Sequence, residues 1–416
     1  MSDRPAAGLT PLSTEARLQG APLAVEPAAL RPVSVAAAIV ILAGLLLASV
    51  QTYEGGTGAK LSLSLAFGTA FGIVIQRARF CFFCMFRDWY DHRDPRGIFG
   101  LLVALGVGLL GYSIVFGAWL PDASSGRLPP DAFIGPVSLA LVLAGLAFGA
   151  GMAISGSCVS AHLYRLGEGS PTAPFALVGT VIGFIAGFMS WNPLYLAFIS
   201  GAPVVWLPGW LGYAGTLTLA FLLLGLVAYA LTLRSSGPRE SASADSPWKR
   251  VLVDRWPAWL GGIAVGVLGM ASYLRVAPLG VTAELSSQAR LAGETLNLMP
   301  LRLDGLDTFR GCVTIIRDAA LSPNGAFVIA MVLSAFAAAL VAGQFRPAWP
   351  SGSQILRGLG GGVLLGWGAM IGLGCTVGTL LSGIMAGALS GWVFGAAVFV
   401  GIAVMLKIGR PLKLTV

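Results

Sequence analysis

Two glycine-rich segments, each containing a cysteine, carry the residue types best suited to hold a small anion. One runs from Gly156 to Cys158 and the other from Gly374 to Thr376. Glycine permits a tight turn, and a helix that starts there directs its free amides and the positive end of its dipole toward an anion. The thiol adds a small, polarizable, weak donor. Because charged side chains are costly inside a membrane, a thiol suits such a site better than Lys or Arg.

Other side chains near these segments are candidates for the same chemistry. His162 follows Cys158 by four residues and is suited to hydrogen-bond an anion, to shuttle a proton or simply to contact a neighbouring helix. Arg79 precedes Cys81 and either attracts an anion or follows the general excess of arginine on one membrane side. The predicted substrate-binding residues are Cys81, Cys158, Cys375, Gly156, Ser157, Gly374, Thr376, His162 and Arg79.

The composition indicates a membrane protein. Of 416 residues, 26 are basic and 18 are acidic, so 11% are charged, whereas soluble domains carry about 25%. No Asp, Glu, Lys or Arg occurs in 170–233 or in 358–406. A soluble fold would expose such stretches as one large apolar patch. The composition excludes a soluble enzyme, a nucleic-acid binder, a disordered chain and a secreted disulfide scaffold.

Ten apolar runs are long enough to cross a bilayer, because roughly 20 helical residues span its hydrocarbon core. They are 33–50, 61–76, 98–120, 133–153, 174–190, 213–233, 257–275, 325–343, 356–373 and 388–407. Most Lys and Arg residues fall in loops on one side when these spans are counted, and that side is predicted to be cytoplasmic. We therefore expect a multi-pass protein of the bacterial inner membrane with both termini in the cytoplasm.

The two cysteine segments also align with each other as parts of an internal repeat. Cys81 and Cys158 follow spans that run inward, whereas Gly280 and Cys375 follow spans that run outward. The predicted fold is an all-α polytopic membrane protein with about ten transmembrane helices in two inverted repeats, whose short re-entrant half-helices carry the Gly/Cys motifs. The alternative is a chance alignment of the small residues that recur wherever membrane helices pack.

This repeat divides the chain into five predicted parts. They are a cytoplasmic tail (1–32), an additional N-terminal transmembrane helix (33–56), a first repeat (57–233), a cytoplasmic linker (234–256) and a second repeat (257–416). The linker is rich in Ser, Gly and Pro, which is typical of a flexible connection.

The cysteine motifs resemble those of the YeeE/YedE family of sulfur transporters over roughly residues 60–410. The motifs are Gly-Ser-Cys158-Val-Ser-Ala-His-Leu-Tyr-Arg, Gly-Leu-Gly-Cys375-Thr-Val-Gly-Thr and Arg-Ala-Arg-Phe-Cys81. The resemblance implies uptake of thiosulfate, passed between Cys158, Cys375 and Cys81 through S–H···S contacts, and a cytoplasmic TusA-like sulfur-carrier protein as partner. The sequence departs from the family pattern at Thr379, in the N-terminal span, in the long loop 276–324 and in the second thiol Cys84. Because of this second thiol, either Cys81 or Cys84 is the relay member.

Three functions remain open at this point. The first is import of a small sulfur-containing anion, most simply thiosulfate, with a selenium oxyanion as a related substrate; it needs no cofactor or metal, and the chain has no Walker motif for ATP. The second is a membrane thiol-disulfide oxidoreductase that uses the C-x-x-C pair Cys81 and Cys84. The third is a structural or channel subunit. Cys84 and Cys312 are predicted to be packing residues, and Arg165 is predicted to pair with Glu168.

Overall fold

The computed structural model describes residues 32–54, 58–235, 251–300, 302–314, 321–412 and 414–415. Most of the predicted tail (1–31) and the centre of the predicted linker (236–250) lie outside these residues. The longer helices are α1(Pro32–Glu54), α2(Ala59–Arg77), α3(Phe82–His92), α4(Arg96–Trp119), α5(Leu139–Ser155), α6(Val159–Gly167), α7(Ala173–Leu194), α8(Leu207–Leu233), α10(Ala258–Arg275), α11(Ala283–Thr295), α12(Pro323–Val341), α13(Gly352–Ile371) and α15(Leu389–Gly409). The π-helix η6(Thr376–Ser382) and the single turn α14(Gly383–Met385) lie between α13 and α15.

The described helices confirm an all-α polytopic membrane protein. Nine of them, some continued by a short helix, are long and apolar enough to cross a membrane. A tenth candidate is the pair formed by α13 and residues Thr376–Met385, which bends by 44° at a short break. Each of the ten predicted apolar runs corresponds to one of these candidates.

One predicted helix start is wrong. The apolar run 133–153 suggested a helix from residue 133, but α5 begins at Leu139. The Ser138 side chain caps that helix by accepting a hydrogen bond from the Leu141 amide at 3.1 Å. The preceding residues are held instead by another segment, since the Val137 amide donates to the Pro203 carbonyl. Apolar composition alone therefore misplaced the boundary that the serine cap sets.

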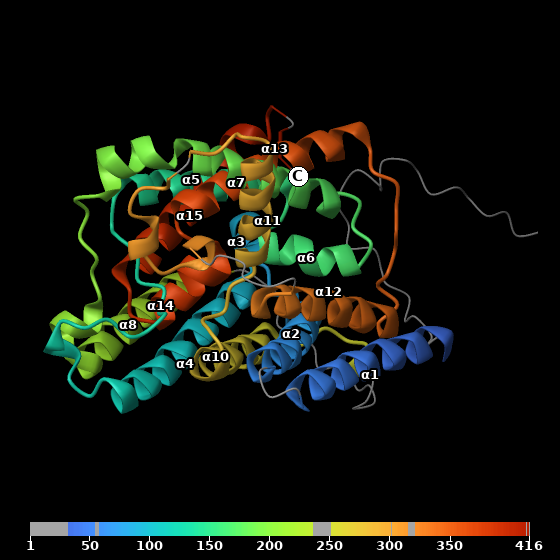
Figure 1. The fold of residues 1–416 in the computed structure, drawn as a ribbon. Helices are drawn as coiled ribbons and strands as arrows, with labels where there is room; N and C mark the ends of the chain where they lie inside the picture. The colour runs from blue at the N-terminus through green and yellow to red at the C-terminus, as the bar shows by residue number, and fades with distance from the viewer. Residues whose placement is uncertain are drawn as a thin grey trace, which may run out of the picture.

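The long helices form two bundles, and each bundle takes helices from both halves of the chain. In one bundle α2 packs on α12 and α4 packs on α10; in the other α5 packs on α15 and on α13, and α13 packs on α7. Figure 1 shows the first bundle in the lower half of the molecule and the second in the upper half, with α3 and α6 between them. The additional helix α1 packs on α2 and α12 at the outside of the first bundle.

Glycines bring these helices into backbone contact. A Cβ atom added at Gly183 of α7 would lie 2.1 Å from the Val363 carbonyl oxygen, and one added at Gly366 of α13 would lie 2.0 Å from the Thr180 carbonyl oxygen. Small residues at such interfaces allow the close approach that stabilises helix pairs in membranes. Glycine thus permits the tight packing of α7 against α13.

We expect Gly183→Ala to destabilise the protein by about 1–3 kcal/mol, because the added methyl group overlaps a backbone atom that cannot move alone. The matched control is Gly360→Ala in α13, where an added Cβ meets nothing within 4 Å and where alanine favours the helix. Thermal unfolding of both variants in one detergent would show a lowered midpoint for Gly183→Ala only. Equal midpoints would contradict this account of the packing.

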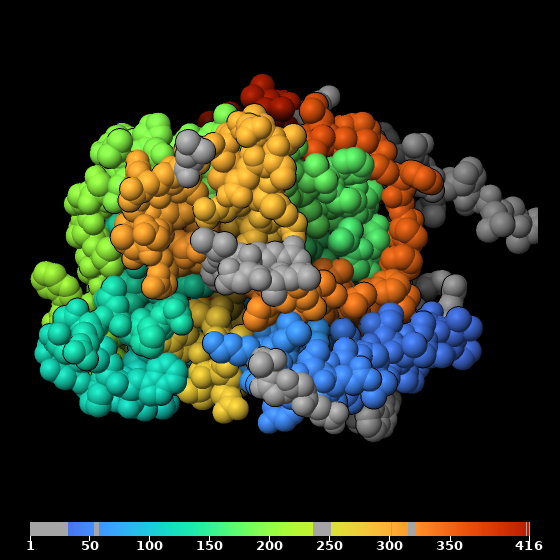
Figure 2. Space-filling model, viewed as in Figure 1, coloured from blue at the N-terminus to red at the C-terminus, as the bar shows by residue number. Residues whose placement is uncertain are grey.

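The long segment between α10 and α12 covers one face of the molecule. Its helix α11 packs on α7, and the Trp191 indole N–H donates to the Asp304 carbonyl at 2.9 Å. The Asn192 side chain donates to the Arg302 carbonyl at 2.8 Å. Figure 2 shows α11 and residues 302–314 lying across this face above the first bundle. The described part of the loop 276–324 is therefore an ordered cover rather than a simple connection.

Candidate functional site

Four breaks between helices are each followed by a shorter helix or turn of helix. The N-cap residues at these breaks are Cys81 before α3, Cys158 before α6, Thr282 before α11 and Cys375 before η6. The first amides of a helix have no partner within the helix, and they favour a negative charge. Three of the five cysteines therefore stand at helix starts, and the Gly/Cys motifs predicted this for Cys158 and Cys375.

The break before α6 is held by short hydrogen bonds. Gly156 ends α5 with φ +84°, a left-handed conformation that glycine adopts without strain. The Ser157 hydroxyl donates to the Gly156 carbonyl at 2.6 Å, and the Cys158 sulfur lies 3.2 Å from the Ser160 hydroxyl. These contacts hold the Cys158 thiol, which has no exposed surface, at the start of α6.

His162 lies on the inner side of the same turn. Its Nε2 atom lies 3.1 Å from the hydroxyl of Ser155, the last residue of α5. Its Nδ1 atom is buried and has no hydrogen-bond partner among the described residues. The histidine therefore joins the two helices across the break, which agrees with the helix-contact interpretation of this residue.

The break before η6 is built differently. Leu373 adopts the left-handed conformation with φ +59°, and the Thr379 hydroxyl donates to the Gly372 carbonyl at 2.9 Å. A Cβ atom added at Gly374 would lie 2.7 Å from that hydroxyl, so the loop has no space for a side chain there. The Thr376 hydroxyl is buried without a hydrogen-bond partner among the described residues. It remains available as a donor beside Cys375.

The break before α3 carries an arginine in a conformation that side chains rarely adopt. Arg79 has φ +47°, and its Nε atom is buried without a hydrogen-bond partner among the described residues. Cys81 follows at the start of α3 and is completely buried. Strained backbone at such a position is common at binding sites, where surrounding structure maintains it.

The five cysteines can be ordered by which side chains act on one another, and we call them the sulfur series. Cys81 lies close enough to Cys84 and to Cys158 for the side chains to interact. Cys375 lies within electrostatic range of Cys158 and of Cys312. The order along the series is therefore Cys84, Cys81, Cys158, Cys375 and Cys312. The structure places Cys81 beside Cys158, and Cys375 acts on Cys158 electrostatically.

Cys312 is the member that sequence analysis assigned to packing only. Its sulfur occupies space left by two glycines, since a Cβ added at Gly280 or at Gly378 would lie 2.4 or 2.5 Å from it. It also lies 3.6 Å from the position of a Cβ on Gly374, directly beside the Cys375 loop. No spacing in the sequence relates Cys312 to the Gly/Cys motifs, because it arrives from the covering segment between α10 and α12.

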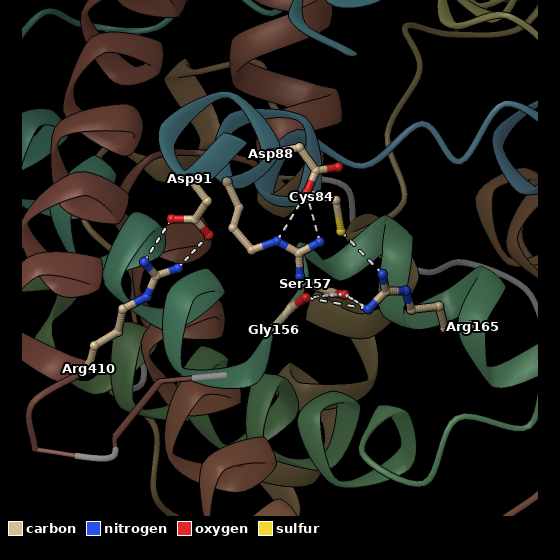
Figure 3. A network of polar contacts seen from close by, with 8 residues as sticks. Cys84, Asp88, Asp91, Gly156, Ser157, Arg165 and Arg410 are labelled. Carbon is tan, nitrogen blue, oxygen red and sulfur yellow. Dashed lines mark hydrogen bonds and ion pairs between the residues drawn. The ribbon is translucent and has the colours of Figure 1, made fainter. Parts of the chain in front are cut away.

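The predicted Arg165–Glu168 ion pair is wrong. Arg165 turns back toward the break before α6, where Nη1 donates to the Ser157 hydroxyl at 2.6 Å and Nη2 donates to the Cys84 sulfur at 3.2 Å (Figure 3). Glu168 instead accepts a hydrogen bond from the Gln76 side chain at 3.1 Å. The physical reason is that the broken helix leaves polar acceptors within reach of Arg165, and partly buried acceptors need donors.

Two cavities lie at opposite ends of α2 and of the sulfur series. The arginine cavity, of about 530 Å³, is lined by residues that include Arg79, Arg165, Arg255 and Cys84. The lysine cavity, of about 190 Å³, is lined by Lys60, Asn324 and Cys312 among others. Because Lys60 and Arg79 lie near the two ends of α2, roughly 27 Å of helix separates the cavities. Buried thiols thus lie between a polar cavity lined by arginines and a mostly apolar cavity that Lys60 lines.

Metal binding has no support among the described residues, because no group of three or more His, Cys, Asp or Glu side chains there could hold an ion. The chemistry of the region is that of thiols, hydroxyls, backbone amides and, at one end, guanidinium groups. Such donors suit a polarizable anion.

Comparisons with known proteins agree with this chemistry. A family model described as "Sulphur transport" matches residues 77–404. The thiosulfate transporter TsuA of Spirochaeta thermophila is 29% identical over 345 residues, which cover 79% of this chain and 92% of that protein. TsuA of Escherichia coli is 24% identical over 343 residues, covering 78% of this chain and 87% of that protein.

A further relative matches a shorter part. The probable transporter YedE of Salmonella typhimurium is 31% identical over 169 residues, covering 40% of this chain and 39% of that protein. The resemblance drawn from the cysteine motifs is therefore confirmed, and the oxidoreductase hypothesis is set aside because these relatives are transporters. This chain belongs to the sulphur transport (YeeE/YedE) family of multi-pass membrane transporters.

Proposed function

We propose that the protein imports thiosulfate, or a closely related small sulfur-containing anion, and that the anion moves along the sulfur series. The observation that carries this proposal is the position of the series between the lysine cavity and the arginine cavity. The names of the TsuA relatives support thiosulfate as the substrate.

The residues along this path suit transport better than tight binding. Within the series the anion meets thiols, the hydroxyl of Thr376 and the amides at the starts of α6 and η6. Each is a weak or partial donor, so that no single site retains the anion. A path of several weak sites permits both entry and release, as ion conduction requires. The predicted substrate-binding residues Gly156, Ser157 and Gly374 act here through the loop conformation that presents the thiols.

We also propose the inverted-repeat organisation. In this organisation each helix of the first repeat corresponds to one of the second: α2 to α10, α4 to α12, α5 to α13 and α7 to α15. When corresponding helices are exchanged, each principal helix contact becomes another contact that the structure contains. The contact of α2 with α12 becomes that of α10 with α4, and the contact of α5 with α15 becomes that of α13 with α7. This exchange supports the predicted repeats 57–233 and 257–416, with α1 added outside them.

The arginine cavity is proposed to face the cytoplasm of a bacterium, with the protein in its inner membrane and both termini inside. Support comes from the basic residues Arg79, Arg87, Arg165 and Arg255, which gather at this one end, as the positive-inside rule expects. A TusA-like sulfur-carrier protein, implied by the family resemblance, is proposed as the partner that receives sulfur at that face.

Uptake by purified protein in liposomes tests the proposed function. We expect labelled thiosulfate to accumulate only in vesicles that contain the protein, and unlabelled thiosulfate to compete more strongly than sulfate. Selenite as a competitor distinguishes a selenium oxyanion from a sulfur substrate. Failure of thiosulfate to enter, or preference for selenite, would overturn the substrate assignment.

A further inference from the structure

The arginine cavity contains more positive charge than its own carboxylates balance. Its charged lining consists of Arg79, Arg87, Arg96, Arg165 and Arg255 together with Asp88 and Asp94. Each of the two carboxylates is already engaged by an arginine on its own segment. Arg87 pairs with Asp88 at 2.8 Å, and Arg96 pairs with Asp94 at 2.7 Å. The next carboxylate along α3, Asp91, pairs with Arg410 outside the cavity (Figure 3).

Three guanidinium groups of this cavity have no carboxylate partner in the part of the chain that the structure describes. Within the described residues, Arg79, Arg165 and Arg255 form no ion pair with Asp or Glu. Arg165 is held by neutral acceptors, the Ser157 hydroxyl and the Cys84 sulfur. Glu168 acts on Arg255 electrostatically, but its carboxylate accepts a hydrogen bond from Gln76.

The pKa of Arg255 also indicates an excess of positive charge in the arginine cavity. Burial and the neighbouring Arg79 guanidinium lower the pKa of Arg255 below its ordinary value. Guanidinium groups that repel one another in a partly enclosed space are stabilised by an anion placed among them. The cavity volume of about 530 Å³ leaves ample room for a small oxyanion.

The cavity also reaches the sulfur series. Cys84 lines it and is partly exposed, whereas the other four cysteines are buried. Arg165 links the two regions, because one guanidinium nitrogen contacts Cys84 and another contacts the loop before Cys158. An anion that leaves Cys81 would therefore meet a thiol and a guanidinium group together.

We infer that the arginine cavity is a second, distinct binding site for the transported divalent anion, at which Cys84, Arg165, Arg79 and Arg255 receive it from Cys81 before release. This inference rests on the proposed function for the identity of the anion. It gives Cys84 a role in addition to that of Cys81, where sequence analysis considered packing, redox chemistry or the place of Cys81 in the relay. It also gives a role to Arg165, which sequence analysis assigned to a local ion pair.

Modification of Cys84 tests this site in the full-length protein in detergent, where both faces are accessible. The probes are two methanethiosulfonate reagents of similar size, one carrying a sulfonate and one a trimethylammonium group. Each rate is divided by the rate of the same reagent with a free small thiol. We expect the anionic reagent to be favoured at least ~10-fold, because a basic cavity concentrates anions by that order, and we expect thiosulfate to slow the labelling. Cys84→Ala identifies the labelled residue.

The combined variant Arg79→Gln/Arg255→Gln is expected to reduce the preference for the anionic reagent by about 10-fold. The matched control is Arg127→Gln, which removes an exposed arginine outside the cavity and is expected to leave the preference unchanged. Equal normalised rates for the two reagents on the wild-type protein, or labelling that thiosulfate does not slow, would overturn the inference.

The outcomes also separate this inference from the proposed function. Thiosulfate uptake without protection of Cys84 would overturn the second site and leave the transport function intact. Protection of Cys84 in a protein that does not transport thiosulfate would support the site and overturn the transport function.

Discussion

Replacing Cys158 and Cys375 together by alanine is expected to lower thiosulfate uptake by at least ~100-fold at unchanged protein level. Both thiols are buried at the start of a short helix, and alanine removes the S–H donor from each. A hydrogen bond to a charged group contributes about 1.5–3 kcal/mol, and a thiol, as a weak donor, lies at the lower end, so each thiol accounts for roughly 10-fold. The measurement is the initial rate of labelled thiosulfate uptake in liposomes.

Two comparisons make this result specific. Serine in place of each cysteine keeps a donor but is less polarizable, so we expect rates between those of the alanine variant and the wild type. Ser334→Ala serves as the control, because it truncates an equally buried small side chain in α12 away from the breaks. Uptake by the double alanine variant within a few-fold of wild type would contradict the thiol path.

Replacing Gly156 by alanine is expected to reduce uptake by at least ~10-fold while the protein remains folded. Gly156 ends α5 with φ +84°, and a residue with a Cβ atom pays about 1–2 kcal/mol in this conformation. The loop relieves part of that strain by moving, and the next two residues, Ser157 and Cys158, move with it. The reduction in uptake thus comes from a displaced thiol, not from lost stability.

Gly126→Ala is the matched control for this variant. Gly126 has a similar φ of +74°, and an added Cβ there would meet nothing within 4 Å. The two substitutions carry the same kind of backbone strain, so similar losses in thermal stability are expected. Only Gly156→Ala should affect uptake. Equal uptake by both variants would show that the position of the loop before α6 is not critical.

The sequence predicted most of the fold because membrane spans carry a strong local signal. A run of apolar residues long enough to cross a bilayer has few alternatives to a helix, and all ten runs correspond to helix candidates. Boundaries were less secure where polar contacts decide them. The start of α5 depends on a serine cap and on the backbone partner of Val137. A count of apolar residues takes account of neither contact.

Cys158 and Cys375 could be predicted at helix starts, because glycine close to a cysteine at the end of a span marks a break, whereas Cys81 has no glycine near it. Cys312 could not be predicted, since its position depends on how the covering segment packs against Gly280 and Gly378. The hydrogen-bond partners of Arg165 could not be predicted from the sequence either. A neighbouring glutamate three residues away is the obvious partner in sequence, but the break before α6 offers acceptors that exist only in the folded protein.

The location of bound thiosulfate tests the central claim most directly. In a crystal of the full-length protein with thiosulfate, anomalous scattering from sulfur at long wavelength would locate the anion. We predict anion peaks between the two cavities, within ~4 Å of the Cys158 or Cys375 sulfur, as a hydrogen bond from a thiol requires. Thiosulfate bound only at positions away from all five cysteines, in a protein that transports it, would contradict the path described here.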